Sequence, residues 1–294
     1  MTVQEATQLG LSFLTERELP DPLLDVQLIL SSILGRSRAY LLAHPEAILA
    51  SDQVPRFDSW LARRGEGYPL QYMRGVQEFF GRPFQVSPAV FIPRRETELL
   101  VEVSLNWLNT QAQTDIWVLD VGTGSGCIAI TLAKEDSRIR ATAVDALADA
   151  LWVAAINCRA LQCEGRVDFR QGNGLDPVQH LRNHYHLIIS NPPYVGDHEK
   201  IDPSVAKYEP REAVFAGDSG LEFYPRIFEG APPLMAPGGL LVLELAHGAR
   251  AKVCEMAERA GWKTLSVHQD LSGIDRCATF QAKGSPPAAG EPPR

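Results

Sequence analysis

The stretch IWVLDVGTGSGCIAI, residues 116–130, passes from one apolar run through a glycine-rich turn into a second apolar run. The first run is rich in β-branched residues and predicts a buried strand, and the second predicts a helix. Glycines at positions 122, 124 and 126 allow a tight turn, a close approach of a ligand to the backbone, and a helix that begins with free N–H groups. The stretch therefore predicts a strand–turn–helix unit of an α/β fold, with a binding loop at the turn.

Two acidic residues flank this turn along the chain. Asp120 directly precedes it, and Asp145 ends the next predicted strand, where a carboxylate can accept hydrogen bonds from both hydroxyls of a ribose. The GxGxG spacing differs from the GxGxxG of dinucleotide-binding proteins, and glycines alone are also found in ordinary strand-to-helix turns. Together with the two carboxylates, the spacing resembles the S-adenosylmethionine site of class I methyltransferases. The resemblance implies that Gly122 to Gly126 line the methionine and ribose, and that Asp145 holds the ribose.

Strands and helices alternate outward from this unit. Helical periodicity predicts helices at 96–109, 126–135, 149–161, 223–235 and 249–262. Apolar and β-branched runs predict strands at 116–122, 140–146, 166–173, 186–194, 238–246, 263–270 and 276–283. Helices between strands imply right-handed crossovers and a mainly parallel sheet covered on both faces, with an antiparallel edge hairpin formed by the last two strands. The predicted fold class is α/β and, by the resemblance, that of a Rossmann-like class I S-adenosylmethionine-dependent methyltransferase.

The segments outside this alternation have different textures. Residues 1–68 carry helical periodicity interrupted by prolines, which predicts a small N-terminal all-helical domain. Residues 69–92 have Gly or Pro every few positions and predict a linker with a short hairpin rather than a helix. The methyltransferase domain is predicted over 93–283. The tail, 284–294, has little to bury and is predicted to be disordered.

Composition argues against several classes of protein. The 294 residues are 45% hydrophobic and 22% charged, as in an ordinary globular protein, and a formal net charge of −8 argues against stable nucleic acid binding. Five scattered cysteines without a CxxC pair favour reduced thiols. The histidines of HLRNHYH at 180–186 lack the cysteines or carboxylates that would complete a metal site. Without a signal-peptide pattern or a run of ~18 apolar residues, we expect a cytoplasmic protein that binds neither a membrane nor a metal.

A second motif, LIISNPPY at 187–194, ends a predicted strand in a stiff, polar turn. It falls at the carboxyl end of the strand, which is the sheet edge at which open α/β folds bind ligands. Because Asn followed by Pro commonly starts a turn, an ordinary turn is the alternative interpretation. Pro192 and Pro193 restrict φ and remove two N–H donors, which leaves rigid carbonyl acceptors beside the amide of Asn191.

These acceptors suit the methylation of a planar NH₂ group. The nitrogen lone pair of such a group is delocalised, so the nitrogen is a poor nucleophile and must be aimed at the methyl donor. The side-chain oxygen of Asn191 and the backbone carbonyl of Pro192 can accept the two N–H bonds, while Tyr194 packs flat on the planar group. No strong base is needed, because the proton becomes acidic only as the nitrogen gains positive charge. The turn alone leaves adenine, cytosine and glutamine amides open as substrates.

Several motifs together resemble the release-factor glutamine methyltransferases, the PrmC/HemK family. The resemblance covers nearly the whole chain except the tail, and the combination of motifs is specific, whereas NPPY alone is not. The segments that carry it are LLAHPE at 41–46, PLQYMRGVQEFFGRPFQVSPAVFIPRRETELLVE at 69–102, DVGTGSGCIAI at 120–130, SNPPYV at 190–195, YEPREAVFAGDSGL at 208–221 and GIDR at 273–276.

The resemblance implies transfer of a methyl group from S-adenosylmethionine to the glutamine side-chain amide in the Gly-Gly-Gln loop of peptide chain release factors. The helical domain would help to hold the release factor. Carried over by position, the catalytic residues are Asn191, Pro192 and Tyr194, and Pro193 joins them in substrate binding. The cofactor-binding residues are Asp120, Gly122, Thr123, Gly124, Ser125, Gly126, Asp145, Asn173, Gly174 and Asn191.

The chain departs from the family pattern after its third predicted strand. The family usually has an acidic residue and then an aromatic residue there, near the adenine, whereas this chain has Asn173 and Gly174. Asn173 can still hydrogen-bond the adenine amine, but Gly174 removes a stacking surface, which puts the cofactor affinity in question. The segment IPRRETE at 92–98 is expected to border the cleft, with capping of the next helix by Thr97 and Glu98 as the alternative.

Three other functions compete with this interpretation. A ribosomal-protein glutamine methyltransferase shares the NPPY turn and differs mainly in its recognition domain. A DNA adenine methyltransferase would need a basic groove or a target-recognition domain for base flipping, and the acidic balance speaks against it. A non-catalytic binding module on the same scaffold would not need Asn191 or the glycine loop. The sequence does not indicate the oligomeric state.

Overall fold

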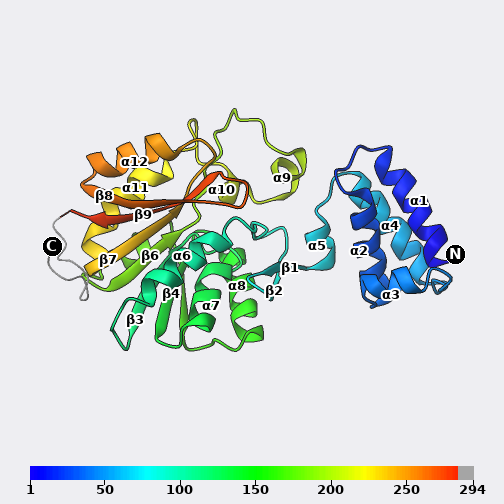
Figure 1. The fold of residues 1–294 in the computed structure, drawn as a ribbon, viewed down its shortest axis with the longest axis horizontal. Coiled ribbons are helices and arrows are strands. Elements are labelled where there is room, and N and C mark those ends of the chain that lie inside the picture. Colours follow the sequence, from blue (N-terminus) through cyan, green and yellow to red (C-terminus); the bar gives the residue numbers. More distant parts are fainter. Residues whose placement is uncertain (284–294) are drawn as a thin grey trace. The chain divides into compact units, whose positions relative to one another are not determined.

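The structure, a computed structural model, describes residues 1–283, which form two compact units (Figure 1). The first unit is Met1–Val76 with Ile201–Tyr208, and the second is Gln77–Lys200 with the described residues from Glu209 onward. The tail 284–294, predicted to be disordered, lies outside the described residues. The domain bounds predicted from the sequence, at residues 68, 92 and 283, remain predictions. Within residues 1–283, no helix combines the length and apolar character that crossing a membrane requires.

The first unit is helical. Its helices are α1 (Val3–Thr15), α2 (Pro22–Leu34), α3 (Arg38–Ala43), α4 (Gln53–Gly65), α5 (Leu70–Arg74) and α9 (Pro203–Tyr208). A capping box starts α1, because the Thr2 hydroxyl accepts from the Glu5 backbone N–H while the Glu5 carboxylate accepts from the Thr2 N–H. Helix α2 begins with a proline, and Gly35 ends it in the left-handed conformation, with φ of 62°.

The core of this helical unit is apolar. Leu14, Ile29, Leu30 and Phe57 are completely buried between α1, α2 and α4. A partly buried ion pair, Arg64 to Asp25 at 2.7 Å, links α4 to α2 at the margin of this core.

Helix α9 joins the helical unit although it follows the Asn191 turn in the chain. The hydroxyl of Tyr208 donates a hydrogen bond to the carbonyl of Glu66 at 3.1 Å. The rings of Tyr208 and Tyr68 meet edge to face, with centroids 4.9 Å apart. This membership depends on long-range contacts, and no local pattern in the sequence indicates it.

A short hairpin follows the first five helices along the chain and precedes the large sheet. Strand β1 (Val76–Phe79) pairs with β2 (Arg82–Gln85) within the segment for which the sequence predicts a hairpin. Helix α5 precedes it, and the glycine- and proline-rich texture did not predict this helix. The helix is only five residues long and stops at Gly75, whose φ is 69°.

The second unit is built on a seven-stranded sheet. Its strands are β3 (Ile116–Val121), β4 (Ile139–Asp145), β5 (Val167–Gln171), β6 (Tyr185–Ser190), β7 (Met235–Glu244), β8 (Trp262–Gln269) and β9 (Asp275–Ala282), in the order β5-β4-β3-β6-β7-β9-β8. The five strands from β5 to β7 are parallel, and β9 pairs antiparallel with both β7 and β8. The predicted mainly parallel sheet with an antiparallel edge hairpin is confirmed.

Helices cover both faces of this sheet (Figure 1). Helices α6 (Glu98–Leu108), α7 (Cys127–Glu135) and α8 (Ala148–Ala160) bury one face, and α11 (Phe223–Gly230) and α12 (Arg250–Arg259) bury the other. Strand β3 serves both cores, since Val118 packs on one side and Leu119 on the other. The short elements are α10 (Arg211–Val214) and the 3₁₀ turns Asp176–Val178 and Pro232–Leu234.

Two predicted helices end earlier than expected. The helix predicted over 249–262 ends at Arg259 in α12, and Trp262 already begins β8. The sequence predicts a helix over 223–235, but α11 ends at Gly230 and β7 begins at Met235. Pro232 and Pro233 explain the difference, because neither can donate to a preceding helical carbonyl, and a 3₁₀ turn replaces the α-helix there.

The strand order reverses between β3 and β6. From β3 the chain runs outward through β4 to β5, then returns to β6 on the other side of β3. In open α/β sheets this reversal leaves a crevice outside the carboxyl ends of the two strands. The glycine loop follows β3 and the Asn191 turn follows β6, so the topology brings both predicted motifs to this crevice.

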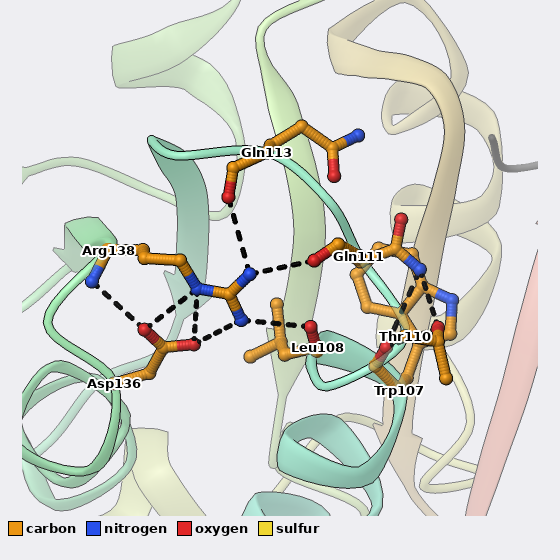
Figure 2. A network of polar contacts seen from close by, with 7 residues as sticks. All are labelled: Trp107, Leu108, Thr110, Gln111, Gln113, Asp136 and Arg138. Carbon is orange, nitrogen blue, oxygen red and sulfur yellow. Dashed lines mark hydrogen bonds and ion pairs between the residues drawn. The ribbon is translucent and has the colours of Figure 1, made fainter. Parts of the chain in front are cut away.

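At the amino ends of β3 and β4, away from the glycine loop, an arginine holds the chain in place (Figure 2). The guanidinium of Arg138, just before β4, donates to the carbonyls of Leu108, Gln111 and Gln113 at 3.0, 2.7 and 3.3 Å. It also forms an ion pair with Asp136 at 2.6 Å. These bonds tie the connection between α6 and β3 to the start of β4, far along the strands from the glycine loop.

Candidate functional site

The glycine loop forms a tight turn between β3 and α7. The backbone N–H groups of Gly122 and Thr123 both donate to the carbonyl of Val144, at 2.8 and 2.9 Å, which holds the loop against the end of β4. Gly126 adopts φ of 80°, and a Cβ there would lie 2.7 Å from the side chain of Ile130. Glycine is therefore required at position 126 both by the backbone conformation and by helix packing.

Asp120 is fully buried at the end of β3. Its Oδ2 accepts from the Thr123 hydroxyl at 2.7 Å and from the backbone N–H of Ala129 at 3.2 Å. Its Oδ1 is buried without a hydrogen-bond partner among the described residues. Burial raises the pKa of Asp120 to about 7, and the two hydrogen bonds only partly oppose that shift. The free oxygen is a candidate acceptor for a ligand's donor group.

Asp145 lies at the end of β4 and fixes the other side of the loop. Its Oδ2 accepts from the backbone N–H of Gly124 at 2.8 Å, and its Oδ1 accepts from that of Leu147 at 3.0 Å. Burial raises the pKa of Asp145, opposed by these backbone hydrogen bonds. Each oxygen keeps a further lone pair, so the carboxylate can still accept from a pair of hydroxyls. The structure thus brings Asp145 to the glycine loop, as the sequence predicts.

Asn173 and Gly174 follow β5 at the same sheet edge. The side chain of Asn173 is exposed, and Gly174 has φ of 58° with nothing within 4 Å of the position of a Cβ. Both border a cavity of about 390 Å³ whose other walls come from residues 175–182, from α11 and from the 3₁₀ turn at 232–234. Neither the glycine loop nor the Asn191 turn is among its described lining residues.

The Asn191 turn lies beside the glycine loop. Ser190, the last residue of β6, donates through its hydroxyl to the carbonyl of Val121 at 2.6 Å. The backbone oxygen of Asn191 is 4.0 Å from the place where a Cβ on Gly122 would be. A side chain at position 122 would therefore enter the space between the two motifs. The structure brings the two motifs together as the sequence predicts.

Thr97 and Glu244, which the sequence did not assign to the site, form hydrogen bonds with the side chains of the Asn191 turn. Nδ2 of Asn191 donates to the hydroxyl oxygen of Thr97 at 3.1 Å, and the Thr97 hydroxyl donates to Oε2 of Glu244 at 2.7 Å. The hydroxyl of Tyr194 donates to Oε1 of Glu244 at 3.3 Å. Glu244 ends β7, and its side chain is almost completely buried.

The alternative assignment of Thr97 and Glu98 to helix capping is wrong. Thr97 is at the cap position of α6, but its side chain makes no capping hydrogen bond. The Glu98 carboxylate accepts instead from the backbone N–H of Phe80 at 2.7 Å, in the hairpin connection. The only sequence signal for Thr97 was its position in the IPRRETE segment, which was expected to border the cleft.

The YEPRE motif supports the same segment. The Glu209 carboxylate, buried in the second unit, accepts from the backbone N–H of Ile92 at 3.0 Å and forms an ion pair with Arg94 at 2.5 Å. Residues 92–94 and Glu209 are separated by more than a hundred positions in the chain, so this contact joins two motifs that are distant in sequence.

Two family models and a solved structure match parts of this chain. Residues 5–75 match the family described as the PrmC N-terminal domain, and residues 92–208 match the methyltransferase small domain. A T. thermophilus 16S rRNA N2 G1207 methyltransferase, solved with AdoMet and guanosine, is similar in fold, with a TM-score of 0.50 and 17% identity. That similarity covers 71% of this chain and 49% of that chain, and it bears on the fold alone.

Similarities of sequence to two relatives span both units. The release factor glutamine methyltransferase of Koribacter versatilis is 41% identical over 278 residues, 94% of this chain and 97% of the relative. That of Geobacter sulfurreducens is 36% identical over 277 residues, 94% of this chain and 95% of the relative. Identity at this level, over nearly the full length of this chain and of each relative, establishes that the chain belongs to the release factor glutamine methyltransferase family.

Proposed function

We propose that this protein transfers a methyl group from S-adenosylmethionine to the side-chain amide nitrogen of the glutamine in the Gly-Gly-Gln loop of peptide chain release factors. The observation that carries the proposal is the orientation of Asn191. Its Nδ2 is bonded to Thr97, so Oδ1, on the other side of the planar amide, is left for a substrate donor. An acceptor at this place, beside the glycine loop, suits an NH₂ substrate.

The residues of the glycine loop fit S-adenosylmethionine. A buried oxygen of Asp120 without a partner among the described residues suits the ammonium group of the methionine part. Asp145, whose carboxylate oxygens each keep a lone pair, suits the ribose hydroxyls. When bound, the cofactor supplies an electrophilic methyl group on a sulfonium. Asn173 and Gly174 offer the adenine one polar side chain and no stacking surface.

The Asn191 turn acts by orientation. Oδ1 of Asn191 and the carbonyl of Pro192 accept the two N–H bonds of the substrate amide, so its lone pair is directed at the methyl group. Tyr194 offers its ring to the flat amide, and the bond from its hydroxyl to Glu244 restricts that ring. The nitrogen becomes acidic only as it gains positive charge, so the turn needs acceptors rather than a strong base.

The substrate assay tests this function directly. The purified protein is incubated with S-adenosylmethionine and, in separate reactions, release factor, ribosomal protein and duplex DNA. We expect the tryptic fragment with the Gly-Gly-Gln motif to gain the mass of one methyl substitution. Transfer to ribosomal protein or DNA but not to release factor would refute the proposal. The absence of stable nucleic acid binding and the cytoplasmic location stay predictions.

Replacing Asn191 tests the role of the turn. Asn191→Ala is expected to lower kcat about 100-fold or more, because one of two acceptors that orient the substrate nitrogen is lost. Asn106→Ala, at an exposed position on α6, is the matched control and should keep kcat unchanged. Equal turnover in the two variants, with both folded, would contradict the role assigned to Asn191.

A further inference from the structure

Behind Asn191 lies a buried carboxylate without a cation. Glu244 is 1% exposed, yet it forms no ion pair among the described residues. The nearest cation on its neighbouring strand, Arg276, pairs instead with Asp270 at 3.1 Å. The side-chain donors to Glu244 are two hydroxyls, those of Thr97 and Tyr194. A buried carboxylate is costly, and apolar side chains of this size pack more easily, so packing alone does not explain a glutamate here.

The carboxylate sets the direction of the hydrogen bonds in front of it. Glu244 is ionised above about pH 7, and in that form its carboxylate accepts and cannot donate. The Thr97 hydroxyl therefore donates its single proton to Glu244. The Thr97 oxygen then has only lone pairs to offer Asn191. Asn191 can meet these lone pairs with its NH₂ end, and the bond from Nδ2 to Thr97 at 3.1 Å has this direction.

The direction matters because the two ends of an asparagine amide have nearly the same shape. Rotation by half a turn exchanges Oδ1 and Nδ2 without a change in packing, and only hydrogen bonds decide between the two orientations. With its NH₂ end toward the substrate, Asn191 would direct N–H donors at the substrate NH₂ group, which is itself a donor. The substrate nitrogen would then lose one of its two acceptors.

We propose that Thr97 and Glu244 are positioning residues, which hold the Asn191 amide with Oδ1 toward the substrate through the chain Glu244–Thr97–Asn191. The inference rests on the proposed function, since it explains how one acceptor of the substrate NH₂ is held. It adds two residues that come from the start of α6 and the end of β7, remote in sequence from the turn that they orient.

Four variants test the chain of hydrogen bonds. Thr97→Val keeps the shape but removes the hydroxyl. Glu244→Met removes the acceptor, so the Thr97 hydroxyl can donate to Oδ1 of Asn191 and favour the reversed amide. Thr97→Ser keeps the hydroxyl. Glu244→Gln keeps an acceptor, because its Oε1 can accept from Thr97 while its NH₂ donates to the Tyr194 hydroxyl.

The expected kcat separates the two variants that break the hydrogen-bond chain from the two that keep it. Thr97→Val and Glu244→Met should lower kcat for release-factor methylation about 10- to 100-fold, with KM and cofactor affinity nearly unchanged. Thr97→Ser and Glu244→Gln should stay within about threefold of the wild type. Thr279→Val, which removes another buried hydroxyl on the same sheet, is the control and should keep kcat. If the first pair keeps kcat, or if the conservative pair loses as much as the first, the proposal is overturned.

A second measurement does not depend on the activity. In protein with ¹⁵N-labelled asparagine, the side-chain NH₂ protons of Asn191 should exchange with water more slowly in the wild type and Thr97→Ser than in Thr97→Val and Glu244→Met. Equal exchange in all four would refute the positioning role, even in a wild type that methylates release factor. The expected pattern in a wild type without that activity would leave the positioning role standing and refute the proposed function alone.

Discussion

At the residue scale, the site is a set of hydrogen-bond acceptors with fixed directions. Asp120 offers one buried oxygen at the glycine loop, and Asn191 offers one at the neighbouring turn. Both are held by a hydroxyl, that of Thr123 in the first case and that of Thr97 in the second. A threonine hydroxyl serves this purpose because it can donate and accept at once, and its rotamer is restricted by β-branching.

The affinity for the cofactor should depend on pH through Asp120. Burial raises the pKa of this carboxyl to about 7, and an ammonium group beside it favours the ionised form. Below about pH 7, binding must therefore displace a proton from Asp120. The dissociation constant for S-adenosylmethionine should rise by up to about tenfold for each unit by which the pH falls. Isothermal titration calorimetry at pH values from about 5.5 to about 8.5 measures this change in the dissociation constant.

Asp120→Asn is the control for that dependence. It should bind more weakly at pH 8 than the wild type and lose the slope, because the amide does not titrate in this range. The same slope in the variant would assign the dependence to another group.

At the element scale, two features position these residues. The reversal of strand order between β3 and β6 brings the glycine loop and the Asn191 turn to one crevice. The start of α6 and the end of β7 then meet behind the turn, where Thr97 bonds to Glu244. At the other end of the strands, the bonds of Arg138 tie the α6–β3 connection to β4 and so fix α6 relative to the sheet (Figure 2).

Removing the guanidinium of Arg138 should affect stability without affecting catalysis. Arg138→Met removes the guanidinium hydrogen bonds to three carbonyls and the ion pair with Asp136, so the free energy of unfolding of the second unit should fall by about 2–3 kcal/mol. Denaturant unfolding measures the change. Arg170→Met, which breaks the more exposed pair with Asp168, should cost less than about 0.5 kcal/mol. Similar losses in the two variants, or a large fall in kcat for Arg138→Met, would contradict this account.

At the scale of the whole molecule, buried carboxyls shape the dependence of stability on pH. Burial raises the pKa values of Asp120 and Glu244 to about 7, well above those of the unfolded chain. The folded state then binds more protons than the unfolded state, so the stabilising contribution is complete at acidic pH and is lost as pH rises through about 7.

The cofactor-free protein should therefore lose stability between about pH 4 and pH 7, from the ordinary pKa values of the two carboxyls up to their raised values. Thermal unfolding at a series of pH values measures the trend, and the doubly substituted Asp120→Asn, Glu244→Gln protein should have a flatter profile. An unchanged slope in that protein would show that other groups dominate.

Much of this organisation follows from local patterns. The strand–turn–helix stretch, the alternation around it and the final hairpin are predicted by sequence pattern. The central strands β3, β4 and β6 are mostly buried, so each contains an apolar run. The end of α11 was misplaced because the helical periodicity continued past Gly230, although Pro232 and Pro233 stop the helix. Helix α5 was missed because five residues between glycine and proline carry too little periodicity.

By itself, the sequence determined the fold class, the glycine loop and the Asn191 turn, since each depends on residues within a short segment. Only the tertiary structure decided that α9 joins the helical unit and that Thr97 and Glu244 stand behind Asn191. Thr97 and Glu244 are 147 positions apart, and Thr97 and Asn191 are 94 apart. Hydrogen bonds over such separations depend on strand order and helix packing, which no local periodicity specifies.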